Sequence, residues 1–197
     1  MGKSLSASLG FEPCELSFGT SGLRGRVADL SQLEVGINTL GFLRFLASTD
    51  QIREASTIWL AGDLRPSTTK AVEIEGLRRG QMLQAVAWAV AQAGYHPAYL
   101  GLIPTPALMA YALSRHEASI MVTGSHIPFD RNGIKFNKPG GEVLKADESA
   151  VLENVRQVRE ETLRQDAATS PFAPDGQLKH DRGAALPHED PVGRRAY

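Results

Sequence analysis

A serine, a histidine and a lysine follow closely after the short apolar segment Ala118–Val122. The segment is expected to form a buried strand that ends before Gly124. Ser125 and His126 come next, and Lys135 follows a little further along the chain. Strand ends in α/β proteins are where ligands bind, because loops there can change without disturbing the sheet. A nucleophile candidate with proton-carrying neighbours in such a loop indicates covalent or group-transfer chemistry.

Ser125 is compatible with more than one kind of chemistry. Hydrolysis would require partners placed by geometry, and the sequence contains no Gly-x-Ser-x-Gly elbow. A phosphate carried on Ser125 fits better, because phosphoserine brings roughly two negative charges and three acceptor oxygens. His126, Lys135 and Arg24 are the candidate donors and cations for it, and Lys135 could also transfer a proton. The alternative is a turn in which Ser125 caps the backbone and Lys135 is solvated.

A glycine-rich segment, residues 18–25, precedes the first predicted helix. Its glycines let backbone amides approach an anion, and Thr20, Ser21 and Arg24 add donors and charge. The spacing is neither that of a Walker loop nor that of a dinucleotide fingerprint. The sequence predicts an anion-binding segment, with an ordinary flexible turn as the alternative.

Two further segments lie at the ends of predicted strands. In residues 62–68 we expect Asp63 and Arg65 to pair and shape the turn, while Ser67 or Thr68 caps the following helix. In residues 103–106 two prolines stiffen the backbone, and this loop is expected to support the site.

Composition excludes several classes of protein. The chain has 197 residues, 42% of them hydrophobic, with a net charge of -1 and one cysteine, Cys14. There is no global field to attract nucleic acid or an anionic membrane, and one cysteine makes neither an internal disulfide nor a thiolate zinc cage. No apolar run approaches the roughly 20 residues that span a bilayer, and the N-terminus lacks a signal-peptide core. We therefore expect a cytoplasmic protein without nucleic-acid or membrane partners.

The predicted elements alternate between strands and helices. In chain order they are helix 31–47, strand 57–61, helix 69–93, strand 98–100, helix 106–113, strand 118–122, a hairpin of 134–136 with 143–144, and helix 147–165. Ser31 and Asp147 are the expected N-caps, and Gly76 and Gly80 weaken the first half of the second helix. This order predicts a three-layer α/β/α sandwich with a mostly parallel mixed sheet and a hairpin at one edge.

The periodicity ends near Gln165. Residues 1–165 are expected to form one domain. Residues 166–197 are rich in Pro, Gly, Asp and Arg, without apolar periodicity, and are interpreted as a linker or arm.

Five segments together resemble a known family. They are Gly-Thr-Ser-Gly-Leu-Arg-Gly at 19–25, Gly-Asp-Leu-Arg-Pro-Ser at 62–67, Pro-Thr-Pro at 104–106, Thr-Gly-Ser-His-Ile-Pro at 123–128 and Asn-Gly-Ile-Lys at 132–135. Their order and spacing resemble the N-terminal domain of the α-D-phosphohexomutases, the phosphoglucomutase and phosphomannomutase superfamily.

The resemblance implies an isomerase that works by intramolecular phosphoryl transfer. Phosphorylated Ser125 would interconvert hexose 1-phosphates and 6-phosphates of glucose or mannose through a bisphosphate, with a glucose 1,6-bisphosphate-type activator. Lys135 and His126 would act in acid–base roles beside Arg24. Substrate-binding residues would be Thr20, Ser21, Arg24 and Lys135. Mg²⁺ would be held partly by the phosphate on Ser125.

Two departures from the family pattern matter. Ile127 stands where the loop usually has Asn. The metal loop, the sugar-recognition loop and the distal phosphate clamp of the other three family domains are not found, so we expect a first-domain fragment that is inactive alone, with a naturally short protein as the alternative. A non-catalytic sugar-phosphate-binding module of the same fold is the competing hypothesis.

Overall fold

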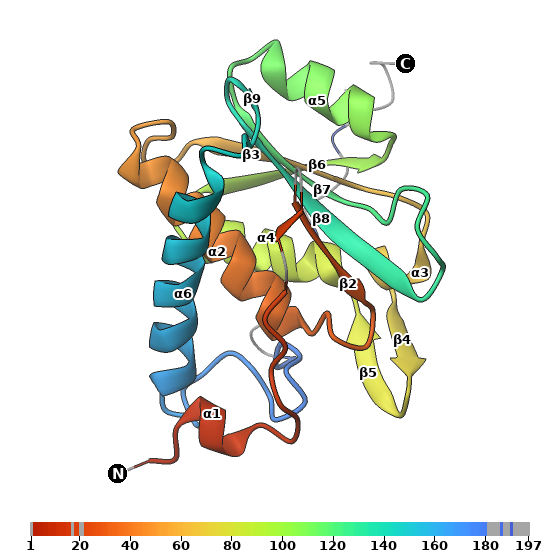
Figure 1. Cartoon of the computed structure of the whole chain (residues 1–197), viewed down its shortest axis with the longest axis vertical. Helices are drawn as coiled ribbons and strands as arrows, with labels where there is room; N and C mark the ends of the chain where they lie inside the picture. Colours follow the sequence, from red (N-terminus) through yellow and green to blue (C-terminus); the bar gives the residue numbers. More distant parts are fainter. Residues whose placement is uncertain (1, 17, 20–21, 181–185, 187–189, 191–197) are drawn as a thin grey trace.

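The computed structural model describes residues 2–16, 18–19, 22–180, 186 and 190 (Figure 1). The elements in chain order are α1 (Leu5–Ser8), β1 (Phe18–Gly19), β2 (Gly22–Arg26), α2 (Gln32–Ser48), β3 (Thr57–Gly62), α3 (Pro66–Thr69), β4 (Ala71–Ile74), β5 (Leu77–Gly80), α4 (Met82–Gln92), β6 (His96–Leu102), α5 (Thr105–Leu113), β7 (Ala118–Val122), β8 (Arg131–Lys138), β9 (Gly141–Glu142) and α6 (Glu148–Arg164).

A seven-stranded mixed sheet forms the centre of the molecule. Its order is β1-β2-β8-β7-β3-β6, with β9 paired to β8. Strand β3 pairs in parallel with β6 and β7, whereas β8 runs antiparallel between β7 and β2. Strands β2, β3, β6 and β7 therefore all run in one direction. Their carboxyl ends, and the loops that follow them, lie at the same edge of the sheet. The predicted α/β/α class with a mostly parallel mixed sheet is confirmed.

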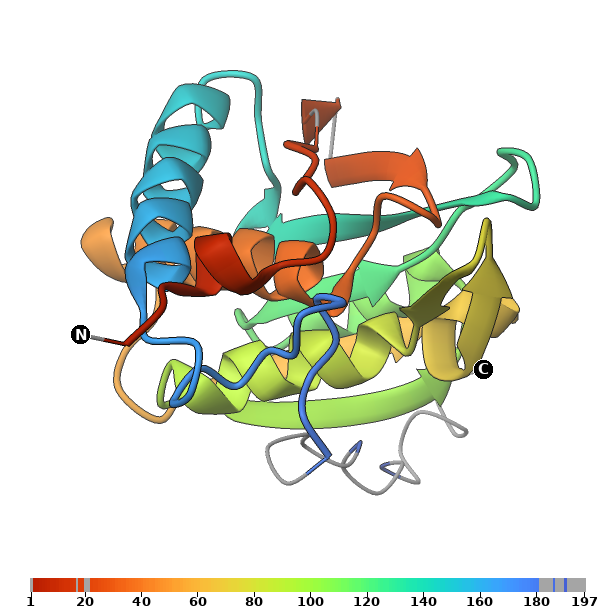
Figure 2. The same ribbon diagram turned by 90° about the horizontal axis from the view of Figure 1, so that it is seen from below.

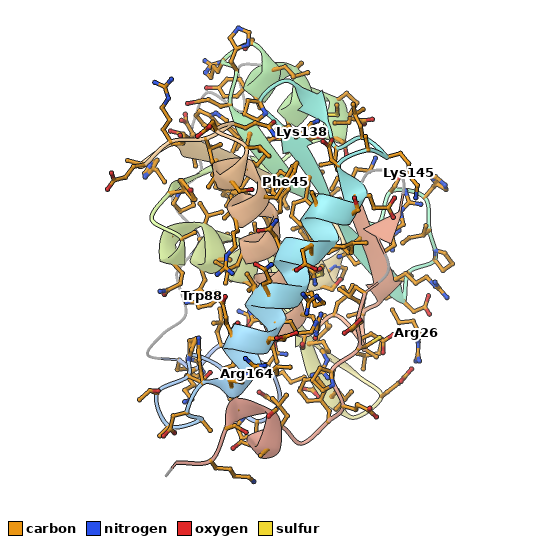
Figure 3. The ribbon with its side chains drawn as sticks, turned by 60° about the vertical axis from the view of Figure 1, so that its left-hand side comes forward. Arg26, Phe45, Trp88, Lys138, Lys145 and Arg164 are labelled. Carbon is orange, nitrogen blue, oxygen red and sulfur yellow. The ribbon has the colours of Figure 1, made fainter. Side chains whose placement is uncertain are left out.

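Helices cover both faces of this sheet. On one face α5 packs over an apolar cluster that includes Trp59, Leu108 and Met121. On the other face lie α2 and α4, and the Phe42 ring of α2 is 4.6 Å from the Phe136 ring of β8. Helix α6 packs against α2 (Figure 3). The larger core therefore lies between the sheet and α2 and α4, opposite α5.

The second predicted helix, 69–93, is wrong in its first half. The chain makes the short helix α3, then the antiparallel hairpin β4–β5, and α4 begins only at Met82. Glu75 and Gly76, with φ of 53° and 73°, form the turn between Ile74 and Leu77. Two consecutive positive φ values match the right-handed twist of paired strands. Glycine at the second position made this turn possible where a helix was expected.

The predicted edge hairpin is placed differently in the structure. Strand β8 lies inside the sheet, between β7 and β2, and only the two-residue β9 returns along it. No strand was predicted in the glycine-rich segment 18–25, but its second half belongs to β2, which pairs with β8 on the side away from β7. Asp147 does not cap α6 through its side chain. Its carboxylate accepts hydrogen bonds from Leu144 N at 2.8 Å and Lys138 Nζ at 2.6 Å.

Residues 166–180, here called the C-terminal strap, fold back onto the domain and run across α4 (Figure 2). Phe172 is 2% exposed, and its ring packs edge-on against Trp88 with centroids 5.0 Å apart. Backbone bonds join Gly10 N to Pro174 O and Leu33 N to Gly176 O, both at 2.8 Å. The strap was interpreted as an arm, but this part of it is packed. The boundary toward a following domain stays a prediction.

Replacing Phe172 with leucine is expected to destabilise the chain by about 1–2 kcal/mol, in the usual range for a core substitution. The change removes aromatic contacts with Trp88 that leucine does not replace. For a chain of this size the melting temperature should fall by about 2–8 °C. Thermal unfolding followed by circular dichroism measures the shift, and an unchanged melting temperature would show that the strap adds no stability.

Candidate functional site

The Ser125 loop leaves the carboxyl end of the buried strand β7, as expected, and leads into β8. Ser125 is exposed and has a left-handed backbone with φ 53°, which is uncommon for a residue with a side chain. Its N–H donates to Thr123 Oγ1 at 2.9 Å. Its Oγ lies 3.2 Å from His126 Nδ1, within reach of a proton transfer. The loop thus presents the hydroxyl outward at a strand end.

Asp63, at the end of the neighbouring strand β3, connects the two strand ends. One carboxylate oxygen accepts from Thr123 Oγ1 at 3.0 Å and Gly124 N at 2.9 Å. The other oxygen accepts from Arg65 N at 3.0 Å and Thr68 Oγ1 at 2.8 Å. The predicted pairing of Asp63 with Arg65 is confirmed by the 3.4 Å distance between Asp63 Oδ2 and Arg65 Nε.

The expected capping by Ser67 or Thr68 is wrong, because both residues lie within α3, which has no side-chain cap. Thr68 donates to Asp63 instead. The Ser67 hydroxyl accepts from Asn132 Nδ2 at 2.9 Å, which ties α3 to the start of β8. The polar side chains of this turn are used to hold two elements together.

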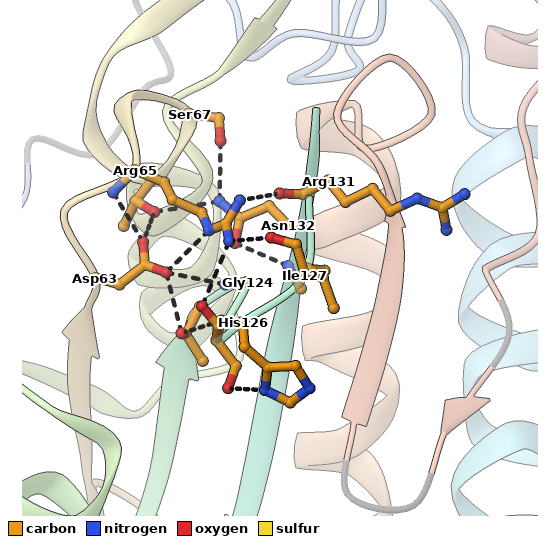
Figure 4. A network of polar contacts seen from close by, with 12 residues as sticks. Asp63, Arg65, Ser67, Gly124, His126, Ile127, Arg131 and Asn132 are labelled. Atoms are coloured by element: carbon orange, nitrogen blue, oxygen red, sulfur yellow. Dashed lines mark hydrogen bonds and ion pairs between the residues drawn. The ribbon is translucent and has the colours of Figure 1, made fainter. Parts of the chain in front are cut away.

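The Arg65 guanidinium reaches across to the Ser125 loop and donates to its carbonyl groups (Figure 4). The acceptors are the carbonyl oxygens of Ser125 at 3.4 Å, Ile127 at 2.5 Å, Pro128 at 2.8 Å and Arg131 at 3.0 Å. A Cβ atom at Gly124 would overlap with this guanidinium, so the close approach requires glycine. The sequence did not predict this contact. The expected ion pair with Asp63 gives a role to Arg65 but does not indicate that its guanidinium also has carbonyl acceptors.

Arg24 and Lys135 lie on one face of neighbouring strands. Arg24 of β2 is opposite Gly133 of β8, and Lys135 is opposite Met121 of β7. Gly133 and Lys135 are two residues apart and share a face, whereas Ile134 points into the core on the other side. The Arg24 Cγ atom lies 3.2 Å from where a Gly133 side chain would begin. A Cβ atom there would also overlap with the Leu23 carbonyl oxygen, so the close approach of the β2 backbone requires glycine at position 133.

This face continues to the Ser125 loop, because Thr123 N donates to Gly133 O at 2.9 Å. Arg24 is exposed and Lys135 is half-buried. Among the described residues neither cation forms an ion pair. The structure therefore places Arg24 and Lys135 on one face of β2 and β8, and β8 is the strand that follows the serine loop.

The remaining predicted site residues are Thr20, Ser21 and the Pro-Thr-Pro segment at 104–106. Thr20 and Ser21 lie outside the described residues. The Pro-Thr-Pro segment begins α5, with Pro104 at its N-cap, and Leu108 of that helix packs beside Trp59. No helix in the part of the chain that the structure describes is long and apolar enough to cross a membrane.

A metal would find few ligands here. The described residues contain no group of three or more His, Cys, Asp or Glu side chains able to hold a metal ion. Both oxygens of Asp63 are already engaged by the turn and by the Ser125 loop. Metal binding through a phosphate on Ser125 stays a prediction.

Fold and site define an α/β/α domain that presents a serine beyond a parallel strand, with basic residues on the adjoining face. A family model described as "Phosphoglucomutase/phosphomannomutase, alpha/beta/alpha domain I" matches residues 15–162. The chain belongs to this family and corresponds to its domain I.

Individual relatives agree with this assignment. A phosphomannomutase of Salmonella muenchen is 42% identical over 137 residues, which cover 70% of this chain and 26% of the relative. A phosphoglucosamine mutase of Nitrosomonas europaea is 34% identical over 172 residues, covering 85% of this chain and 34% of the relative. The crystal structure of a putative phosphomannomutase from Thermus thermophilus shares the fold, with a TM-score of 0.59 at 22% identity over 73% of this chain and 30% of that one. The chain thus spans about a quarter to a third of these relatives.

Proposed function

We propose that Ser125 carries a phosphoryl group and exchanges it with a hexose phosphate, as the phosphoserine domain of a phosphohexomutase-type isomerase. One observation supports this most strongly: an exposed serine in a left-handed turn precedes β8, where Lys135 and, on the paired strand β2, Arg24 share one face and form no ion pair among the described residues. Phosphoryl transfer relies mainly on positioning and on neutralising charge, which this arrangement supplies.

The transfer exchanges one phosphorus–oxygen bond for another. The bond from phosphorus to a sugar oxygen of a hexose bisphosphate breaks as the bond from phosphorus to Ser125 Oγ forms. The hydroxyl proton of Ser125 passes to His126 Nδ1, 3.2 Å away, and the sugar oxygen takes a proton from Lys135. Arg24 balances the phosphate charge. The sugar monophosphate then turns around in the site, so that the reverse of these steps places a phosphoryl group on the oxygen at its other end.

Mg²⁺, when bound, would neutralise part of the charge on the transferring group. In the described part of the chain the phosphate on Ser125 is the ligand that could hold it, because the Asp63 carboxylate is occupied. The remaining ligands would come from the other mutase domains. The substrate is a hexose phosphate, and the other mutase domains are the proposed partners.

The backbone of Ile127, the residue that departs from the family pattern, takes part in holding the loop. Its N–H donates to Gly124 O at 3.1 Å, and its carbonyl oxygen accepts from Arg65. The backbone of residue 127 thus holds the loop without a polar side chain.

Back-transfer to sugars tests the proposed function. The chain is first phosphorylated with glucose 1,6-bisphosphate and then mixed with glucose 1-phosphate, mannose 1-phosphate or glucosamine 1-phosphate. When the chain is fused to the remaining part of a relative's chain, we expect the protein to lose phosphate and the sugar bisphosphate to form. Intact-mass analysis measures the first and chromatography the second. A chain that binds the sugars without exchanging phosphate, even when fused to the remaining part of a relative's chain, would favour the binding module and overturn the proposal.

A further inference from the structure

We propose that Arg65 is a positioning residue, which holds the Ser125 loop in the conformation that accepts and donates phosphate. This inference rests on the proposed function for its catalytic meaning, and on the contacts of Asp63 and Arg65, here called the Asp63–Arg65 clamp, for its geometry. Arg65 itself is not assigned any contact with the substrate.

The clamp is built to hold a loop rather than a ligand. The Arg65 side chain is only 15% exposed, and its guanidinium donates to four carbonyl oxygens of residues 125–131. Asp63 accepts from Gly124 N on the other side of the same loop. A planar guanidinium with five fixed donors can serve several acceptors at once. Its donors are thus used within the protein, whereas Arg24 donates no side-chain hydrogen bond to another described residue.

The clamp also compensates for the unusual backbone of Ser125. A non-glycine residue in the left-handed region is strained and persists only where its surroundings impose it. Thr123 Oγ1 accepts from Ser125 N while donating to Asp63, so Asp63 holds this turn through one intermediate. The Arg65 contacts fix the residues that follow. Without Arg65 the loop is expected to relax toward commoner conformations.

The direction of one peptide links the clamp to the phosphate. A trans peptide places its C=O and N–H on opposite sides. Since the Ser125 carbonyl points to Arg65, the N–H of His126 points away from it. Within the described residues this N–H has no hydrogen-bond partner. In Figure 4 the His126 ring also lies on the side away from Arg65. Arg65 thereby leaves a backbone donor available for a phosphate oxygen on Ser125.

The rate of Ser125 phosphorylation by glucose 1,6-bisphosphate tests the inference. Arg65→Ala is expected to lower the maximal rate on the order of 100-fold, the cost of a small misplacement of reacting groups. The bisphosphate concentration at half-maximal rate should stay unchanged, because Arg65 does not contact the sugar phosphate. Arg24→Ala should instead raise that concentration. Arg65→Lys should not restore the rate, since an ammonium cannot serve the same four carbonyls.

Arg164→Ala is the matched control, because Arg164 lies on the exposed side of α6 with its side chain 78% exposed (Figure 3). It should phosphorylate at the rate of the unmodified chain. If Arg65→Ala and Arg65→Lys both react at that rate, the inference is wrong while the proposed function stands.

A second measurement tests the role of the clamp independently of the proposed function. Amide hydrogen exchange in residues 124–131 should be faster in the folded Arg65→Lys variant, with exchange in α6 unchanged. If the unmodified chain takes up no phosphate, the proposed function fails, and this measurement decides whether the clamp holds the loop. Unchanged exchange in residues 124–131 would overturn the clamp in either case.

Discussion

Replacing Ser125 with alanine is expected to abolish uptake of phosphate from glucose 1,6-bisphosphate. The Ser125 hydroxyl is the exposed nucleophile of the loop, and its Oγ lies 3.2 Å from His126 Nδ1. Alanine removes the oxygen that forms the bond to phosphorus and leaves His126 without a proton to accept. Intact-mass analysis should show one phosphate on the unmodified chain and none on the variant.

Two comparisons make this result specific to the serine. Ser114→Ala changes an exposed serine at the end of α5 and should leave phosphate uptake unchanged. Thermal unfolding of Ser125→Ala should be similar to that of the unmodified chain, since the Ser125 side chain is exposed and, among the described residues, contacts only His126 through a hydrogen bond. A phosphate adduct that persists in the folded Ser125→Ala chain would assign the phosphoryl carrier to another residue.

Replacing Arg159 with alanine is expected to destabilise the domain by about 3–5 kcal/mol, the cost of leaving a buried charge without its partner. Arg159 of α6 donates to both oxygens of Glu34 in α2, each at 2.6 Å. The Glu34 side chain is fully buried. Urea unfolding measures the loss. Arg164→Ala, on the exposed side of the same helix, should change stability by no more than about 0.5 kcal/mol.

An apolar pair tests whether the loss comes from the unpaired charge. Glu34→Leu combined with Arg159→Met removes both charges and keeps similar volumes, so it should recover most of the stability. A double variant as unstable as Arg159→Ala would show that packing of these two side chains, rather than the uncompensated carboxylate, accounts for the effect.

The destabilisation by Arg159→Ala should depend on pH. Burial raises the pKa of Glu34 above its ordinary value, and the hydrogen bonds and charge of Arg159 oppose that rise. Removing Arg159 therefore raises this pKa further. A carboxyl whose pKa is raised on folding stabilises the fold while it is protonated, and this contribution is lost as pH rises through the folded-state pKa.

The difference in unfolding free energy between the unmodified chain and Arg159→Ala should therefore be small below about pH 4, near the ordinary glutamate pKa, and grow toward neutral pH. Urea unfolding of both chains across this range measures it. A difference that does not vary with pH would contradict the role given to the Glu34 charge.

The strands and helices that have strong apolar periodicity were predictable from the sequence. The strand Ala118–Val122 was predicted with its observed ends, and Ser31 accepts from Glu34 N at the start of α2 as expected. The position of the serine loop was also predictable, because the loop comes directly after a buried strand. These features depend on neighbouring residues in the chain, which the sequence displays directly.

Features that depend on distant residues were missed. The chain from Gly22 to Arg26 becomes a strand because β8 provides a partner far along the chain. The C-terminal strap shows no apolar periodicity. Phe172 is nevertheless buried, because its ring packs against Trp88 in the same hydrophobic core as residues of α2. Arg65 pairs with Asp63 as predicted, but the carbonyl groups that also accept its hydrogen bonds lie some sixty residues further along the chain. Local pattern does not encode such contacts.

The identity of the modified residue after incubation with glucose 1,6-bisphosphate tests the central claim most directly. The protein is digested and its peptides are mapped by mass spectrometry, both for this chain and for its fusion to the remaining part of a relative's chain. The proposed role predicts one phosphate, located on Ser125. A Ser125 that stays unmodified in both proteins would contradict it.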